Sequence, residues 1–313
     1  MAVRHWGEAM RLPVFRAIGA TFAFIARNLL DILKIIWLPT ILTCLAYVLI
    51  MPPFMAAYGA MPAPTPGDAM GPLMVSLPYQ LALLILSALI NVPLFSGLMK
   101  LIVRGERPKL LPLSFGADER NMLGSFGLIF AGIVALFAAF GGALLLAQLF
   151  ASMGPGPGAI IGLVAAVVLI GVGIWLTARV SLASPATIAF KRLGVQPSWD
   201  VTEDNAWRLI GFWLLWIVPM FIISSLLTPL LTAPGYLDAT KEIFAAARSP
   251  ARMQAAVQHS YQVLAAGYVL SDMGNLVRLL ANARLAFLAT TVLAIASGIA
   301  WRELTAQGDI EQI

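Results

Sequence analysis

The longest stretch of this chain without a charged side chain covers residues 121–178, which is 58 consecutive positions. A transmembrane helix needs about 20 mostly apolar residues, because about 30 Å of hydrocarbon is crossed at about 1.5 Å per residue. The run is therefore too long for one crossing and long enough for two. It is interrupted by Met153-Gly-Pro-Gly-Pro-Gly158, and proline and glycine favour a turn. We predict one span at 122–152 and another at 158–177.

Four further charge-free runs predict four further spans. The predicted spans are 35–58, 78–98, 209–231 and 285–301. Pro52-Pro53 and the proline-rich stretch 61–72 (MPAPTPGDAMGP) are expected to stop the first of them. Composition points the same way, because 60% of the residues are apolar and 11% are charged, whereas about 25% are charged in a soluble domain. These features exclude soluble, disordered and fibrous proteins, and they predict one all-α integral membrane domain over residues 1–313 with six spans.

Lysine and arginine indicate which end of each span faces the cytoplasm. With the N-terminus inside, 15 of the 20 basic residues fall in inner segments, and the loops at 53–77 and 153–158 hold none. The other five fall in a long outer segment, where charge bias matters less. We therefore predict that both termini are cytoplasmic. The basic residues flank the spans, where anionic headgroups attract them, so the net charge of +5 does not indicate a nucleic-acid partner.

Each odd-numbered span follows a stretch with interfacial character. Residues 1–30 contain an apolar periodicity of three and four, which predicts an amphipathic helix in the headgroup plane. The stretches 113–123 and 198–209 precede spans three and five, and Ser198 or Thr202 is an expected N-cap of the latter. The pattern of interfacial stretch, span, short turn and span suggests three tandem two-span repeats.

The outer segment, residues 232–284, differs from the other loops by its length and polarity. Apolar side chains recur at helical spacing among glutamines, which predicts an amphipathic helix at the outer surface. The alternative is a seventh span at 253–271, but its polar side chains make that costly in lipid. The sequence leaves both readings open.

Signatures of catalysis are missing from the sequence. It has no Walker loop, GxSxG elbow or HExxH motif, and one cysteine excludes a thiolate metal cluster. We therefore predict a protein that is not an enzyme and needs no cofactor.

Polar groups within the spans are the better candidates for function, since they are expensive in lipid. Asn91 lies in the middle of span two, where it could bond a neighbouring helix, satisfy carbonyls freed by Pro93 or face a substrate. Arg179 and Arg284 lie at span boundaries. Gly158 and Gly162 form a GxxxG motif, which is typical of close helix packing.

Three short motifs carry a resemblance to a known family. They are 176–186 (LTARVSLASPA), 199–211 (WDVTEDNAWRLIG) and 301–304 (WREL). With the amphipathic start, they resemble YciC-like bacterial inner-membrane proteins of unestablished function, and the membrane portion attached to some glycerophosphoryl diester phosphodiesterases. The resemblance implies a bacterial inner membrane, six helices and interfacial segments. It implies no catalytic residues, because the phosphodiesterase chemistry belongs to a separate soluble domain.

Two functions remain open at this point. The first is an envelope or assembly factor that acts through membrane lipids or a membrane-protein partner. The second is a carrier or channel for a lipid or small solute, which Asn91 and the prolines within the spans favour.

Overall fold

The computed structural model describes residues 11–59, 71–108, 116–151, 155–231, 235–246, 249–267 and 272–306, and helices are the only regular secondary structure among them. The elements in chain order are α1 (Val14–Arg27), α2 (Leu29–Gly59), α3 (Gly71–Met99), η1 (Lys100–Arg104), α4 (Ala117–Ala151), α5 (Pro155–Val180), α6 (Ala183–Phe190), α7 (Val195–Val201), η2 (Glu203–Asn205), α8 (Ala206–Leu231), α9 (Tyr236–Ala246), α10 (Pro250–Gly267) and α11 (Met273–Thr305). The predicted all-α fold is confirmed.

Six helical stretches of the described chain are long and apolar enough to cross a membrane. They are Leu29–Phe54, Leu77–Arg104, Ala117–Leu136, Gly162–Phe190, Glu203–Leu227 and Met273–Thr305. Each overlaps one of the six spans predicted from the charge-free runs. The chain is therefore an integral membrane protein of the multi-pass class. Residue 152, the last of predicted span three, lies outside the described residues.

α2 runs through Pro52 and Pro53 and ends at Gly59, one residue beyond the predicted end of span one at residue 58; spanning helices tolerate proline when other groups satisfy the freed carbonyls. Most of the proline-rich stretch at 61–72 lies outside the described residues. The structure corrects one predicted boundary. The last helix starts at Met273, so residues 273–284 belong to α11 and not to the outer segment. The prediction started span six after Arg284 because it counted charges, whereas an arginine does not interrupt backbone hydrogen bonding.

The segments before the odd-numbered spans take different forms. Before span one, α1 is a separate helix that ends at Arg27, and α2 starts after Asn28. Before span five lie α6, α7 and η2. Before span three, by contrast, residues 117–121 are the first turn of α4 itself, and residues 113–115 are outside the described part. The suggestion of three similar repeats stays a prediction.

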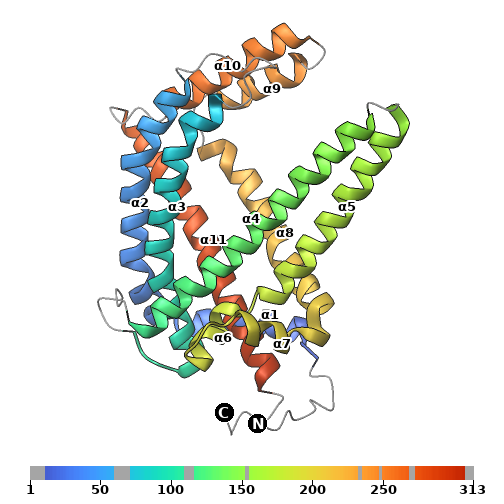
Figure 1. Cartoon of the computed structure of the whole chain (residues 1–313). Helices are drawn as coiled ribbons and strands as arrows, with labels where there is room; N and C mark the ends of the chain where they lie inside the picture. The colour runs from blue at the N-terminus through green and yellow to red at the C-terminus, as the bar shows by residue number, and fades with distance from the viewer. Residues whose placement is uncertain are drawn as a thin grey trace. The chain divides into compact units, whose positions relative to one another are not determined.

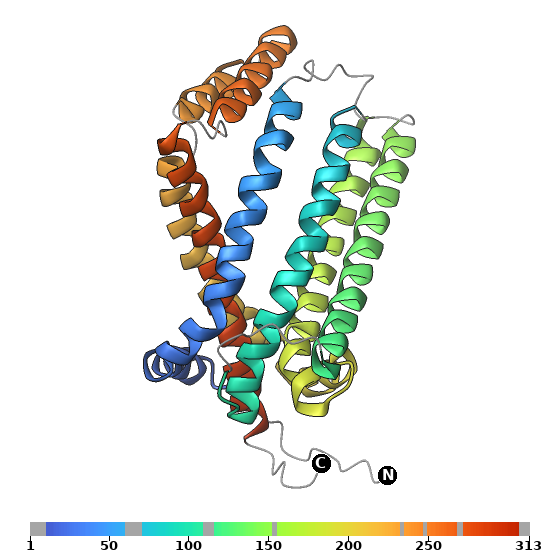
Figure 2. The same cartoon turned by 90° about the vertical axis from the view of Figure 1, so that its left-hand side faces the viewer.

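The chain divides into two compact units. The boundaries between them along the sequence fall within α2, α3, α8 and α11. Unit 1 comprises Met1–Ile35, Val92–Trp216 and Leu293–Ile313, and unit 2 comprises Ile36–Asn91 and Ile217–Val292. In unit 1, α4 and α5 run side by side as a helical hairpin (Figure 1 and Figure 2). Fully buried side chains of unit 1 include Leu98, Met122, Leu182, Leu209 and Ile295.

The end of α11 packs especially closely within unit 1. A Cβ atom at Gly298 would lie 2.9 Å from Cδ1 of Ile102, and Ala294, Ala296 and Ala300 are buried on the same helix. Small residues allow helix backbones to approach where hydrophobic surface alone gives no preference between neighbours. This packing brings α11 close to η1.

In unit 2, α9 and α10 pair as a short helical hairpin (Figure 1). Nδ1 of His259 on α10 lies 2.8 Å from Oε2 of Glu242 on α9. The Lys241 ammonium donates to Asp238 and lowers the pKa of that carboxyl below its ordinary value. The helix α10 is not among the described stretches that are apolar enough to span a membrane. Residues 268–271 of the alternative seventh span lie outside the described residues.

Candidate functional site

Asn91 lies on α3 and forms a polar pair with the residue one turn earlier. Its Nδ2 donates a hydrogen bond of 2.8 Å to Oγ of Ser87. Ser87 is ten residues beyond Leu77 and thirteen before Lys100 on the same spanning stretch, which is about 15 Å and about 20 Å along the helix. The pair therefore lies near the middle of a helical stretch that is long and apolar enough to span a membrane.

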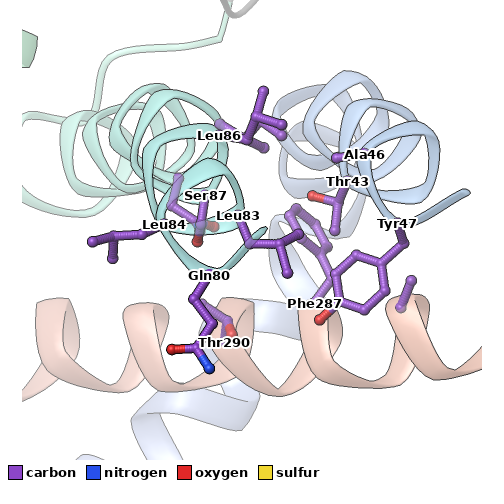
Figure 3. A pocket seen from close by; sticks show the side chains of 13 residues that line it. Thr43, Ala46, Tyr47, Gln80, Leu83, Leu84, Leu86, Ser87, Phe287 and Thr290 are labelled. Atoms are coloured by element: carbon purple, nitrogen blue, oxygen red, sulfur yellow. The ribbon is translucent and has the colours of Figure 1, made fainter. Parts of the chain in front are cut away.

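The Asn91–Ser87 pair lines a cavity of about 430 Å³ in unit 2, shown in Figure 3. Residues from three helices line it, namely α2, α3 and α11. Its apolar lining includes the buried side chains Ala46, Ile90, Ala283 and Phe287. The volume lies within the range of small-molecule sites, which are mostly apolar with a few placed polar groups.

Six uncharged polar side chains also line this cavity. They are Thr43 and Tyr47 on α2, Gln80, Ser87 and Asn91 on α3, and Thr290 on α11. In Figure 3 the side chains of Tyr47 and Gln80 extend from α2 and α3 towards α11. Four hydroxyls and two amides offer both donors and acceptors. A ligand with an uncharged hydrogen-bonding group and an apolar part matches this lining.

Arg179, the second predicted site residue, lies in the last turn of α5 in unit 1 and is only 4% exposed. Its Cζ lies 4.5 Å from the ring centroid of Trp199 and 5.6 Å from that of Trp175. The two indoles meet edge to face, with centroids 5.2 Å apart. Arg179 could be selected from the sequence as a site residue, but its contact with Trp199 could not, because Trp199 lies on a different helix, 20 positions away.

The carbonyl oxygen of Arg179 accepts hydrogen bonds from Ser198 and Thr202, the two residues predicted as N-caps. Oγ of Ser198 donates to it at 2.8 Å, and Oγ1 of Thr202 donates at 3.1 Å. Ser198 lies inside α7 and is not an N-cap. Thr202 occupies the N-cap position of η2, but its side chain forms no capping hydrogen bond there. The two hydroxyls instead satisfy a carbonyl at the C-terminus of α5, which lacks a helical partner.

The remaining predicted residues occupy separate places. Arg284 is exposed on α11, eleven residues beyond the start of that helix. Gly158 and Gly162 both lie on α5, four residues apart and so on one helix face. The surroundings of Gly158 lie outside the described side chains. The structure therefore does not bring the five predicted residues into one site, and only Asn91 lines the unit 2 cavity.

A charged network in unit 1 was not predicted from the sequence. The Glu119 carboxylate is 2% exposed and accepts hydrogen bonds from Nζ of Lys100 at 2.7 Å and Oγ of Ser96 at 2.8 Å. Arg104 donates to both oxygens of Asp118 and to the carbonyl of Ile188. Buried charges are unfavourable unless they are paired. These pairings link η1 to α4 and to α6. A visible signal was the arrangement of basic residues at 100–104 and acidic residues at 118–119 on either side of one loop.

Within the described part of the chain, no group of three or more His, Cys, Asp or Glu side chains is arranged to hold a metal ion. No family model, curated protein or solved structure matches the chain.

Proposed function

We propose that this protein acts in the membrane by binding a neutral lipid, with the Asn91 cavity as the binding site. The observation that carries the proposal is the combination of uncharged hydrogen-bonding groups with an apolar lining, midway along a stretch of α3 that is long and apolar enough to span a membrane. An uncharged glyceride headgroup can donate hydrogen bonds to the hydroxyls and amides of the lining and accept them from it. Its acyl chains would lie along the apolar lining.

In this proposal the chain is a non-enzymatic factor of a bacterial inner membrane, with both termini in the cytoplasm. It organises the envelope by holding lipid or by presenting it to a membrane-protein partner. The α1 helix supports a role at the lipid boundary, because Phe15 and Phe22 are 82% and 58% exposed while Ala17 and Thr21 are buried. Its aromatic side chains would sit among the lipid headgroups. The resemblance to YciC-like inner-membrane proteins is part of this proposal, because it implies the same membrane and no catalytic residues.

The test uses the full chain in phosphatidylcholine nanodiscs containing a trace of diacylglycerol with a photoactivatable group beside the glycerol. We expect cross-linked peptides to concentrate on residues 43–47, 80–91 and 283–290. Asn91→Leu and Thr43→Val should each reduce the labelling about fivefold, since one hydrogen bond contributes about 1 kcal/mol. Thr177→Val is the matched control, because Thr177 is exposed on α5 and bonds only within its own helix. Labelling spread evenly over all lipid-facing helices would overturn the proposal.

A second candidate is a carrier for a lipid or small uncharged solute. The polar lining midway along α3 favours it, since carriers often bind substrate near the middle of the membrane. Proteoliposomes would be assayed for scrambling of a fluorescent diacylglycerol and for glycerol uptake. Flux that Asn91→Leu abolishes would support the carrier. Site-specific labelling without any flux would support lipid binding alone.

A further inference from the structure

A second cavity, of about 610 Å³, lies in unit 1 and shares no residue with the Asn91 cavity. Its lining is mostly apolar, but it contains one cation and one amide, Arg192 and Gln196. Trp199 also lines it. The same indole stacks against the buried Arg179 guanidinium, which does not itself line the cavity. Arg192 is exposed and contacts the Phe190 ring.

Neither arginine is neutralised by a carboxylate. Among the ion pairs of the described residues, none includes Arg179 or Arg192; their recorded contacts are with aromatic rings, and Nε of Arg179 is buried without a hydrogen-bond partner. A buried cation without a counter-ion is unfavourable, and stacking on indoles compensates for it only in part. An anion at this place would remove the imbalance.

The nearby carboxylates do not fill that role. Asp118 and Glu119 are engaged with Lys100 and Arg104. Asp200, Glu203 and Asp204 are exposed, and none of them lines the cavity. The positive potential of the two arginines therefore stays available to a ligand.

We propose that this cavity binds the phosphate of an anionic phospholipid. Arg192 contacts the phosphate, Gln196 donates to the glycerol or ester oxygens, and Arg179 adds positive potential from behind Trp199 while holding the indole in place. A phospholipid fits better than a free phosphate because Leu128, Leu193 and Val195 supply apolar surface for the acyl chains. Trp175, which is 38% exposed near the end of α5, occupies the boundary position typical of membrane tryptophans.

The experiment uses the full chain in nanodiscs with equal amounts of phosphatidylglycerol and phosphatidylcholine, and native mass spectrometry counts the lipids retained. We expect a preference for phosphatidylglycerol that falls about tenfold in Arg192→Gln and at least threefold in Arg179→Gln. Arg120→Gln is the matched control, because Arg120 is an exposed arginine of α4 that does not line the cavity.

Three results would overturn the proposal. One is equal retention of the two lipids by the unmodified chain. The second is an equal loss of preference in Arg120→Gln and Arg192→Gln, which would indicate diffuse charge attraction. The third is displacement of the lipid by soluble glycerol 3-phosphate at an equal concentration. Circular dichroism checks the fold of each variant; if Arg179→Gln does not fold, Arg192→Gln decides the outcome, and an unchanged preference in a folded Arg179→Gln removes the role given to Arg179.

Discussion

Oδ1 of Asn205 accepts a hydrogen bond of 2.8 Å from the backbone N–H of Leu12, 193 residues earlier in the chain. Asn205 ends η2 immediately before α8, and Leu12 lies just before α1. Leu12 is 1% exposed and Asn205 is 3% exposed. This hydrogen bond therefore attaches the segment before α1 to the segment before α8.

Asn205→Ala should release this attachment. The Leu12 N–H would be left buried without an acceptor, which costs about 1–3 kcal/mol. We expect a lower free energy of unfolding and faster trypsin cleavage after Arg16, measured on the protein in detergent. Asn121→Ala is the control, because the Asn121 amide is exposed where it donates to Lys191, and such a change should cost about 0.5 kcal/mol or less. Equal cleavage rates in the two variants would contradict the prediction.

Glu119→Gln should weaken unit 1 at the junction of η1 and α4. Lys100 would keep only its longer ion pair with Asp118, at 3.4 Å, so we expect a loss of at most about 3 kcal/mol. The double variant Lys100→Met with Glu119→Leu should lose less than the sum of the two single changes, since neither charge remains. Unfolding in SDS measures all of these values. For comparison, Asp31→Asn breaks the more exposed pair with Lys34 and should cost about 0.5 kcal/mol; additive single changes would count against a coupled pair.

Gly194→Ala should disrupt the turn between α6 and α7. A Cβ atom at Gly194 would overlap the carbonyl oxygen of Ala183 and the backbone nitrogen of Thr187, so the turn must open and we expect a loss of at least about 2 kcal/mol. Gly211→Ala provides the opposite case, because nothing lies within 4 Å of its added Cβ on α8. That change should stabilise the protein by up to about 1 kcal/mol. Thermal unfolding of both variants tests the pair, and a tolerated Gly194→Ala would refute the close approach.

Reporter fusions test the orientation drawn from the basic residues. Fusions after residues 110, 195 and 313 should all report the cytoplasm, and a fusion after residue 248 should report the opposite side. Alkaline phosphatase and a fluorescent protein give opposite signals on the two sides, so each position is read twice. An external signal after residue 313 is incompatible with six spans and a cytoplasmic N-terminus.

The number and positions of the described helices that are apolar enough to span a membrane follow from the amino-acid sequence alone. Each predicted span depends on the summed transfer free energy of about 20 consecutive residues, which is a local property. The boundary error at residues 273–284 has the same local origin. Arg284 was treated as the edge of span six, although the backbone hydrogen bonds of α11 continue past it.

The sites were determined only by tertiary structure. Asn91 could be selected because an amide is rare within a span, but its cavity also needs Tyr47 and Thr290 from two other helices. Arg179 could be selected in the same way, whereas its contact with Trp199 depends on α7 folding back against α5. Lipid is as apolar as the helix surfaces, so hydrophobicity does not specify which faces meet. That choice depends on small residues, hydrogen bonds and buried charges that come together only when the helices pack.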